Sequence, residues 1–128
     1  QYRHWLAGRV DESTPLYVME DGRIEKLLGF NFHRGVLACG HRRRSPELAD
    51  VRSLDEPRAT VAVGVGIQDP ENLGGILRNC AAFGVAAVIL GPNCTDPFSR
   101  RVLRVSAGAA RRIPIVESPE LGRDLDQL

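Results

Sequence analysis

The segment 69–84 constrains the fold of this chain more than any other part of the sequence. It lies between two apolar runs, residues 60–67 and 86–90, and their small and branched side chains fit parallel strands that are buried on both faces. Asp69 is a favourable N-cap and Gly84 is well placed to end a helix. The segment therefore predicts a strand, a turn, a helix and a second strand, in that order.

The predicted helix carries residues that indicate either a ligand or close packing. Gly74 and Gly75 each cost about 1 kcal/mol relative to alanine inside a helix. Arg78 follows them closely enough for its guanidinium to reach back over a patch without side chains. Asn72 stands near the helix N-terminus, where free N–H groups favour a phosphate. The sequence leaves open the alternative that the glycines permit helix packing and that Arg78 pairs with an acid.

A further helix and strand are predicted after residue 91. Asp96-Pro97 is a second N-cap and first-turn signal, and we expect its helix to run to about residue 110. The apolar side chains at helical spacing are Phe98, Val102, Val105 and Ala109. Residues 113–116 are expected to form a strand, and residues 119–128 begin another helix. This alternation predicts an α/β fold with a parallel sheet and flanking helices.

The region before residue 59 is less regular. Residues 1–45 are expected to be part of a small α/β domain, with strands at 16–19 and 36–39 and a helix at 23–28 whose inward side chains are Ile24, Leu27 and Leu28. That region is too short to bury a good core alone. Residues 46–58 are polar and are predicted to be a linker.

Composition and charge exclude several classes of protein. The net charge is +1, yet Lys26 is the only lysine among 17 basic residues, which fits either a GC-rich genome or phosphate binding. Three widely spaced cysteines indicate reduced thiols and a cytoplasmic protein. No apolar run is long enough to span a membrane, and no metal-ligand spacing is present. Asp69 stands where a dinucleotide-binding GxGxxG motif requires glycine.

The ten residues from Asp69 to Arg78 resemble the first sequence motif of the SpoU (TrmH-type) RNA methyltransferases of the SPOUT superfamily. Other segments match in the family's order and spacing, namely Leu90-Gly91-Pro92, 96–99, 105–109 and 113–116. Upstream, residues 32–38 are similar to the end of the substrate-binding domain that often precedes the catalytic one. The resemblance covers roughly residues 16–118.

The resemblance implies a fold and domain organisation. Residues 1–45 would be part of an RNA substrate-binding domain, and residues 59–128 the first half of a SPOUT-like α/β-knot domain. The motifs that form the knot around S-adenosylmethionine, a Gly-x-Glu turn and a Ser-Leu-Asn-Val run, would lie after Leu128. We therefore expect no cofactor-binding residues in this segment, and neither tight S-adenosylmethionine binding nor RNA methylation by residues 1–128 alone.

The resemblance also implies an activity, which is methyl transfer from S-adenosylmethionine to a ribose 2′-hydroxyl of ribosomal or transfer RNA by a homodimer. Arg78 would be the catalytic arginine, with Asn72 beside it. Because arginine is a poor free base, we expect it to bind phosphate or orient the hydroxyl rather than remove the proton itself. The predicted RNA-binding residues are Glu71, Gly74, Gly75, Arg100, Arg104, Ser106, Arg42, Arg43 and Arg44.

Two other functions are compatible with the sequence. A non-catalytic RNA-binding protein could use the same basic surfaces. The run Arg42-Arg43-Arg44 would then contact phosphates, although it could equally be a solvated charge run. A small-ligand α/β domain without any RNA role is the third possibility, and it predicts that Arg78→Ala leaves RNA binding and methylation unchanged.

Overall fold

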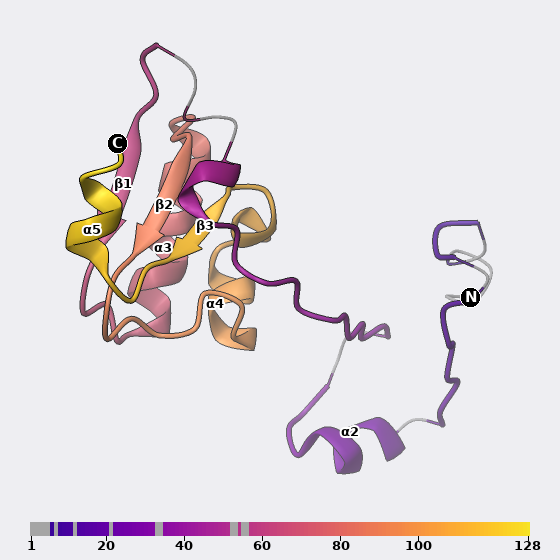
Figure 1. Cartoon of the computed structure of the whole chain (residues 1–128). Coiled ribbons are helices and arrows are strands. Elements are labelled where there is room, and N and C mark those ends of the chain that lie inside the picture. Colours follow the sequence, from indigo (N-terminus) through magenta and orange to yellow (C-terminus); the bar gives the residue numbers. More distant parts are fainter. Residues whose placement is uncertain are drawn as a thin grey trace. The chain divides into compact units, whose positions relative to one another are not determined.

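The structure is a computed structural model that describes residues 6, 8–11, 13–20, 22–32, 35–51, 54 and 57–128. The chain divides into two compact units, Gln1–His41 and Arg42–Leu128. Figure 1 shows the elements of each unit, which are described separately below.

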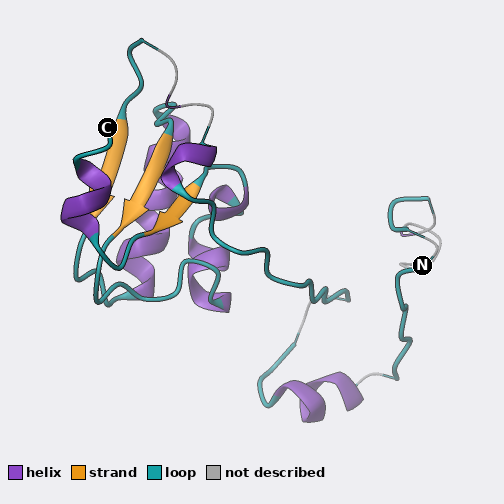
Figure 2. Cartoon of the chain, viewed as in Figure 1, coloured by secondary structure: helices purple, strands orange, loops and turns teal. Residues whose placement is uncertain are grey.

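The second unit is built on a three-stranded parallel sheet, as the sequence predicts. Its strands are β1 (Val61–Gly64), β2 (Ala87–Leu90) and β3 (Ile115–Glu117), and β2 lies between the other two (Figure 2). Ile89 in β2 stands opposite Val63 in β1 and Val116 in β3. Each strand is shorter than the apolar run that predicted it.

Helical segments cover both faces of this sheet (Figure 1). The segments packed on one face are α3 (Pro70–Ala82), α4 (Arg100–Val105) and the 3₁₀ turn η3 (Ala109–Arg111), and those on the other are η1 (Leu48–Asp50) and α5 (Leu121–Leu125). Side chains alternate along β2, so that Val88 and Leu90 join the core under α3 while Ala87 and Ile89 join the core on the opposite face.

Helix α3 begins and ends where the sequence predicts. The carboxylate of Asp69 accepts a hydrogen bond from the N–H of Glu71 at 2.8 Å, Pro70 opens the helix, and Gly84 follows it with φ of 70°. Leu73, Leu77 and Cys80 are buried against the sheet. Burial raises the pKa of the Cys80 thiol.

The helix predicted to run to about residue 110 is shorter in the structure. It ends at Val105 because Ala107 and Gly108 take left-handed backbone conformations, with φ of 50° and 83°. The chain then continues as η3. The prediction was wrong about both ends, because the helix begins at Arg100 after the N-cap Ser99 and not after Asp96, but Val102 and Ala109 are buried as expected.

Part of the predicted linker packs on the second unit. Leu48 and Val51 are buried in the core beside Ala87, Ile89 and Val116. The hydroxyl of Ser45 donates to the carbonyl of Ile115 at 2.9 Å and accepts from the N–H of Glu117 at 2.9 Å. The chain around Ser45 therefore runs along β3, one of the two edge strands, and satisfies polar backbone groups there.

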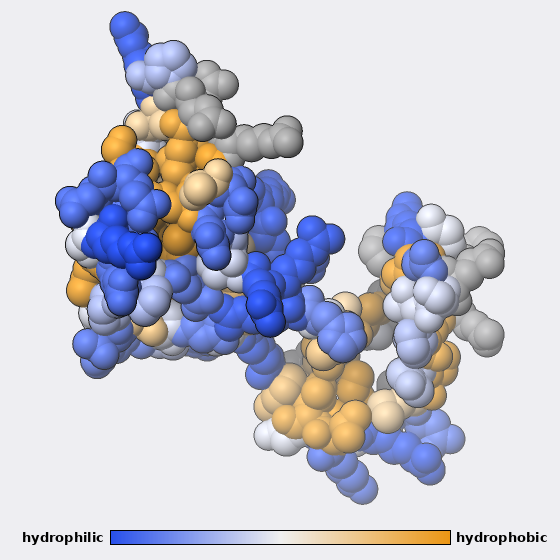
Figure 3. All heavy atoms as spheres, viewed as in Figure 1, coloured by the Kyte–Doolittle hydropathy of each residue, from blue (hydrophilic) through white to orange (hydrophobic). Residues whose placement is uncertain are grey.

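The first unit contains α2 (Arg23–Leu28) at the predicted position, but the two predicted strands are absent, since residues 16–19 and 36–39 are described and are not in a sheet. Tyr17 is 83% exposed and Leu27 is 71% exposed, so the expected inward orientation of Leu27 was also wrong. Figure 3 shows apolar side chains at the surface of this unit. Isolated strands without partners and a packed face are not stable in water. None of the helices in the described residues is long and apolar enough to cross a membrane.

Candidate RNA-facing site

Helix α3 presents separate faces to the sheet, to α4 and to a cleft. Asn72 and Arg78 are six residues apart, which places them about 120° apart around the helix axis. Asn72 faces the cleft, whereas Arg78 faces α4. The structure therefore does not bring these two predicted residues together on a single face of the helix.

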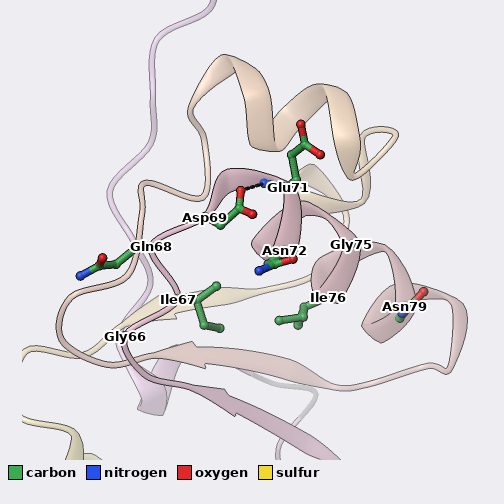
Figure 4. A pocket seen from close by; sticks show the side chains of 9 residues that line it. All are labelled: Gly66, Ile67, Gln68, Asp69, Glu71, Asn72, Gly75, Ile76 and Asn79. Atoms are coloured by element: carbon green, nitrogen blue, oxygen red, sulfur yellow. Dashed lines mark hydrogen bonds between the residues drawn. The ribbon is translucent and has the colours of Figure 1, made fainter.

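The α3 cleft, as we call it, has a volume of about 510 Å³ and opens beside the N-terminal half of the helix. Its lining residues are Gly66, Ile67, Gln68, Asp69, Glu71, Asn72, Gly75, Ile76 and Asn79. Figure 4 shows Asn72 and Ile76 on the helix and Ile67 on the loop after β1, all bordering the same space. The predicted residues Glu71, Asn72 and Gly75 thus share one surface depression with neutral amide side chains.

Gly75 and Gly74 differ sharply in their surroundings. A Cβ atom added to Gly75 would have no heavy atom within 4 Å, so this glycine leaves space open to the cleft. A Cβ atom added to Gly74 would lie 2.7 Å from Cβ of Val105 and 3.2 Å from the backbone nitrogen of Ser106. Gly74 therefore permits close packing of α3 on α4, as in the packing alternative that the sequence left open. Gly75 has no such packing role.

Arg78 is exposed, but its guanidinium is held in place. Its Nη1 donates a hydrogen bond to the carbonyl oxygen of Val105, the last residue of α4, at 3.0 Å. A helix C-terminus carries unsatisfied carbonyls and a partial negative charge, and both favour an arginine there. Among the described residues this guanidinium makes no other hydrogen bond, so its remaining N–H donors can bind a ligand. The partner in this hydrogen bond is a backbone carbonyl and not the acidic side chain that the sequence allowed as an alternative.

The carboxylates at the start of α3 are engaged. Asp69 caps the helix, and Glu71 forms an ion pair with Arg101 of α4. The hydrogen bond that Arg101 donates to the Glu71 carboxylate, together with the negative charge of that carboxylate, raises the pKa of Arg101. Because exposed carboxylates repel phosphate unless neutralised, this pair lowers the negative charge at the rim of the α3 cleft.

The other predicted RNA-binding residues lie in different environments. Arg100 and Arg104 are exposed on α4, and Arg43 and Arg44 are exposed before η1. Ser106 is only 1% exposed, and its hydroxyl donates to the carbonyl of Leu103 at 3.2 Å. In this structure Ser106 offers RNA no accessible surface, because it closes the end of α4.

Arg42 is occupied by contacts within the second unit. Its guanidinium forms ion pairs with Asp96, at 3.0 Å, and with Glu117, and it lies over the Phe98 ring at 4.9 Å from the centroid. Together with the Ser45 hydrogen bond, these contacts hold the start of the second unit beside β3. The run of three arginines is therefore not a uniform charged surface.

We expect Arg42→Ala to lower the free energy of unfolding of the full-length gene product by about 1 kcal/mol, because two ion pairs and a cation–π contact are lost at a half-exposed site. Urea denaturation at low and high salt measures this. Arg123→Ala is the matched control, since the Arg123–Glu120 pair is more exposed. Equal losses for the two variants, or a larger loss at high salt, would contradict the assigned role of Arg42.

Sequence reasoning missed the contributions of Arg101 and Val105. Arg101 is separated from Glu71 by 30 positions, and no periodicity links them. Val105 contributes a backbone carbonyl, which no side-chain pattern reports. Only the expectation that two helices pack on the same sheet face could have placed α4 beside α3. Within the described residues, no cluster of His, Cys, Asp and Glu is arranged to hold a metal ion.

Comparison with known proteins gives the family. Residues 59–128 match the SpoU rRNA Methylase family. The chain belongs to this family. It is 39% identical over 112 residues to an uncharacterized tRNA/rRNA methyltransferase of Mycobacterium bovis, a match that covers 88% of this chain and 38% of that protein. It is 37% identical over 118 residues to the 23S rRNA (guanosine-2'-O-)-methyltransferase RlmB of Nitrosomonas europaea, covering 91% of this chain and 45% of that protein.

Solved structures agree with the SpoU assignment and with the predicted fold. The AdoMet-bound rRNA methyltransferase from Sinorhizobium meliloti superposes with a TM-score of 0.55 and is 32% identical, over 66% of this chain and 32% of that one. The SpoU methyltransferase AviRb from Streptomyces viridochromogenes is 23% identical with a TM-score of 0.54, a likeness of fold alone. The chain spans less than half the length of each of the two relatives described above.

Proposed function

We propose that this chain supplies the RNA-binding side of a ribose 2′-O-methyltransferase. The observation that carries the proposal is the Arg78 guanidinium, exposed yet fixed to the end of α4 by the Val105 carbonyl. A charged group that is held in position before substrate binds loses little freedom on binding, and such preorganisation is how fixed groups lower reaction barriers. The names of the RlmB relative and of the rRNA methyltransferase structures support the same activity.

In this proposal Arg78 binds an RNA phosphate next to the reacting ribose, and the free N–H donors of its guanidinium orient the 2′-hydroxyl. Arginine stays protonated at neutral pH, so the hydroxyl proton leaves to the substrate phosphate or to water. Asn72, on the cleft face, contacts the neighbouring part of the RNA rather than the same phosphate. Arg100 and Arg104 of α4 add positive charge along the RNA path.

The methyl donor in the proposal is S-adenosylmethionine, which carries an activated methyl group. The α3 cleft does not suit it well, because its polar lining consists of exposed side chains, and its carboxylates already cap the helix or pair with Arg101. No step is therefore assigned to residues that would hold the donor. We further propose rRNA or tRNA as substrate, a homodimer, and a cytoplasmic location, in line with reduced thiols and with the enzymes that the relatives are named for.

Incubation of the full-length gene product with labelled S-adenosylmethionine and unmodified ribosomal or transfer RNA tests the proposal. We expect label in RNA, at a nucleotide whose 3′ phosphodiester bond becomes resistant to alkaline cleavage because its 2′-hydroxyl is methylated. RNA binding without transfer to either RNA would instead favour the non-catalytic RNA-binding protein. Neither binding nor transfer would favour the small-ligand α/β domain.

A further inference from the structure

The contact between Arg78 and Val105 depends on how closely α4 approaches α3. The side of α3 that carries Arg78 also carries Gly74, one turn earlier, and Gly74 is buried. Val105 lies directly against Gly74, since a Cβ atom there would sit 2.7 Å from its Cβ and 2.9 Å from its Cγ1. Real side-chain atoms do not approach so closely, and the obstructing atoms belong to a stiff β-branched residue and to the backbone.

The end of α4 leaves the Val105 carbonyl available. The N–H groups of Ala107, Gly108 and Ala109 donate to the carbonyls of Arg104, Leu103 and Ser106, respectively. These hydrogen bonds bypass the carbonyl of Val105, to which Arg78 donates instead. The bypass follows from the left-handed conformations of Ala107 and Gly108, of which the first is unfavourable for a residue with a Cβ atom.

We propose that Gly74 is a positioning residue for Arg78. Its missing side chain lets the end of α4 approach α3, so that the Val105 carbonyl holds the guanidinium at a fixed place before RNA binds. This inference rests on the proposed function for its catalytic meaning, but its structural content concerns only the contact itself. The two adjacent glycines thus have different surroundings, because Gly75 faces open space whereas Gly74 lies against Val105.

Gly74→Ala in the full-length gene product tests the inference. A methyl group at this position forces α4 away by several tenths of an ångström, because close-packed interiors have no room to absorb it. We expect kcat for methyl transfer to fall at least ten-fold while KM for RNA changes less than three-fold. Gly122→Ala is the matched control, since its added methyl group meets nothing within 4 Å and lies outside the site. It should leave kcat unchanged.

A double-mutant cycle separates positioning from general destabilisation. If Gly74 acts through Arg78, Gly74→Ala should reduce kcat at least ten-fold in the wild type but less than two-fold in an Arg78→Ala background. The loss of unfolding free energy should be similar in both backgrounds. An equal reduction of kcat in the two backgrounds would overturn the inference and leave the methyltransferase assignment intact.

A glycine exchange keeps the test informative if Gly74→Ala folds poorly. Val105→Gly removes both nearest obstructing atoms yet keeps the carbonyl that binds Arg78. The double variant Gly74→Ala/Val105→Gly should therefore recover kcat to within about three-fold of Val105→Gly alone. A folded double variant without this recovery would contradict the inference. If the wild type transfers no methyl group, the proposed function fails, and the same cycle is measured on RNA affinity, where the effect of Gly74→Ala, smaller than three-fold, should vanish in the Arg78→Ala background.

Discussion

Arg78→Ala should reduce kcat/KM for RNA methylation by at least 100-fold in the full-length gene product, which corresponds to about 3 kcal/mol of lost transition-state stabilisation. The reason is that the variant removes both the positive charge at the reacting phosphate and the donors that orient the hydroxyl. Arg78 is exposed and Val105 is half-buried, so water can replace the hydrogen bond that the Val105 carbonyl loses. We therefore expect little loss of stability, and the measurement is single-turnover transfer of labelled methyl groups.

Arg78→Lys refines this expectation. Lysine keeps the charge but cannot donate to the Val105 carbonyl and to a phosphate with one rigid planar group. Its activity should lie between those of the wild type and Arg78→Ala. Arg123→Ala controls for the loss of one positive charge, since Arg123 is exposed on α5 and lies outside the site. Its activity should stay within two-fold of that of the wild type. Full activity of Arg78→Ala would remove the proposed role and favour a different site for the chemistry.

Much of the second unit could be predicted from the sequence because its signals are local. Asp69, Pro70 and Gly84 fix the ends of α3 through caps and backbone conformation, which depend on few neighbours. The apolar runs at 60–67 and 86–90 favour parallel strands joined by a helix, and β2 is buried on both faces as predicted, whereas Val63 in β1 is 47% exposed. The predicted parallel sheet and α3 boundaries follow from these features.

Other parts were not predictable because distant residues decide them. The break after α4 depends on Ala107 in a left-handed conformation, which alanine disfavours and which only the surrounding packing can impose. Residues 16–19 have the apolar character of a strand, but strands need partners, and no described segment of the first unit pairs with them. Leu48 and Val51 lie in a polar stretch that resembles a linker until the sheet provides a surface to cover.

The candidate site shows the same division. The spacing of four residues correctly placed Gly74 and Arg78 one turn apart on one face of the helix. It could not show whether RNA or protein fills the space next to Gly74. The close approach of Val105 answers this for Gly74 in favour of protein. The open surroundings of Gly75 leave its predicted contact with RNA as a proposal.

Leu77→Ala should lower the free energy of unfolding by about 3 kcal/mol, because it creates a cavity where α3 packs on the sheet. Leu77 is fully buried, with 0% of its surface exposed, in the core that includes Val88 and Val102. Urea denaturation monitored by far-UV circular dichroism measures the loss. Typical domains are stable by only 5–15 kcal/mol, so this variant should unfold at a clearly lower urea concentration.

The same substitution at other leucines tests whether burial, rather than residue type, sets the size of the effect. Leu125 in α5 is 39% exposed and Leu27 in α2 is 71% exposed. We expect Leu125→Ala to cost about 1 kcal/mol and Leu27→Ala almost nothing, since less apolar surface returns to water in each case. A loss for Leu27→Ala that approaches the Leu77→Ala value would mean that α2 is covered by another surface in the full-length gene product. A loss for Leu77→Ala below 1 kcal/mol would contradict the packing of α3 on the sheet, on which the placement of Arg78 also depends.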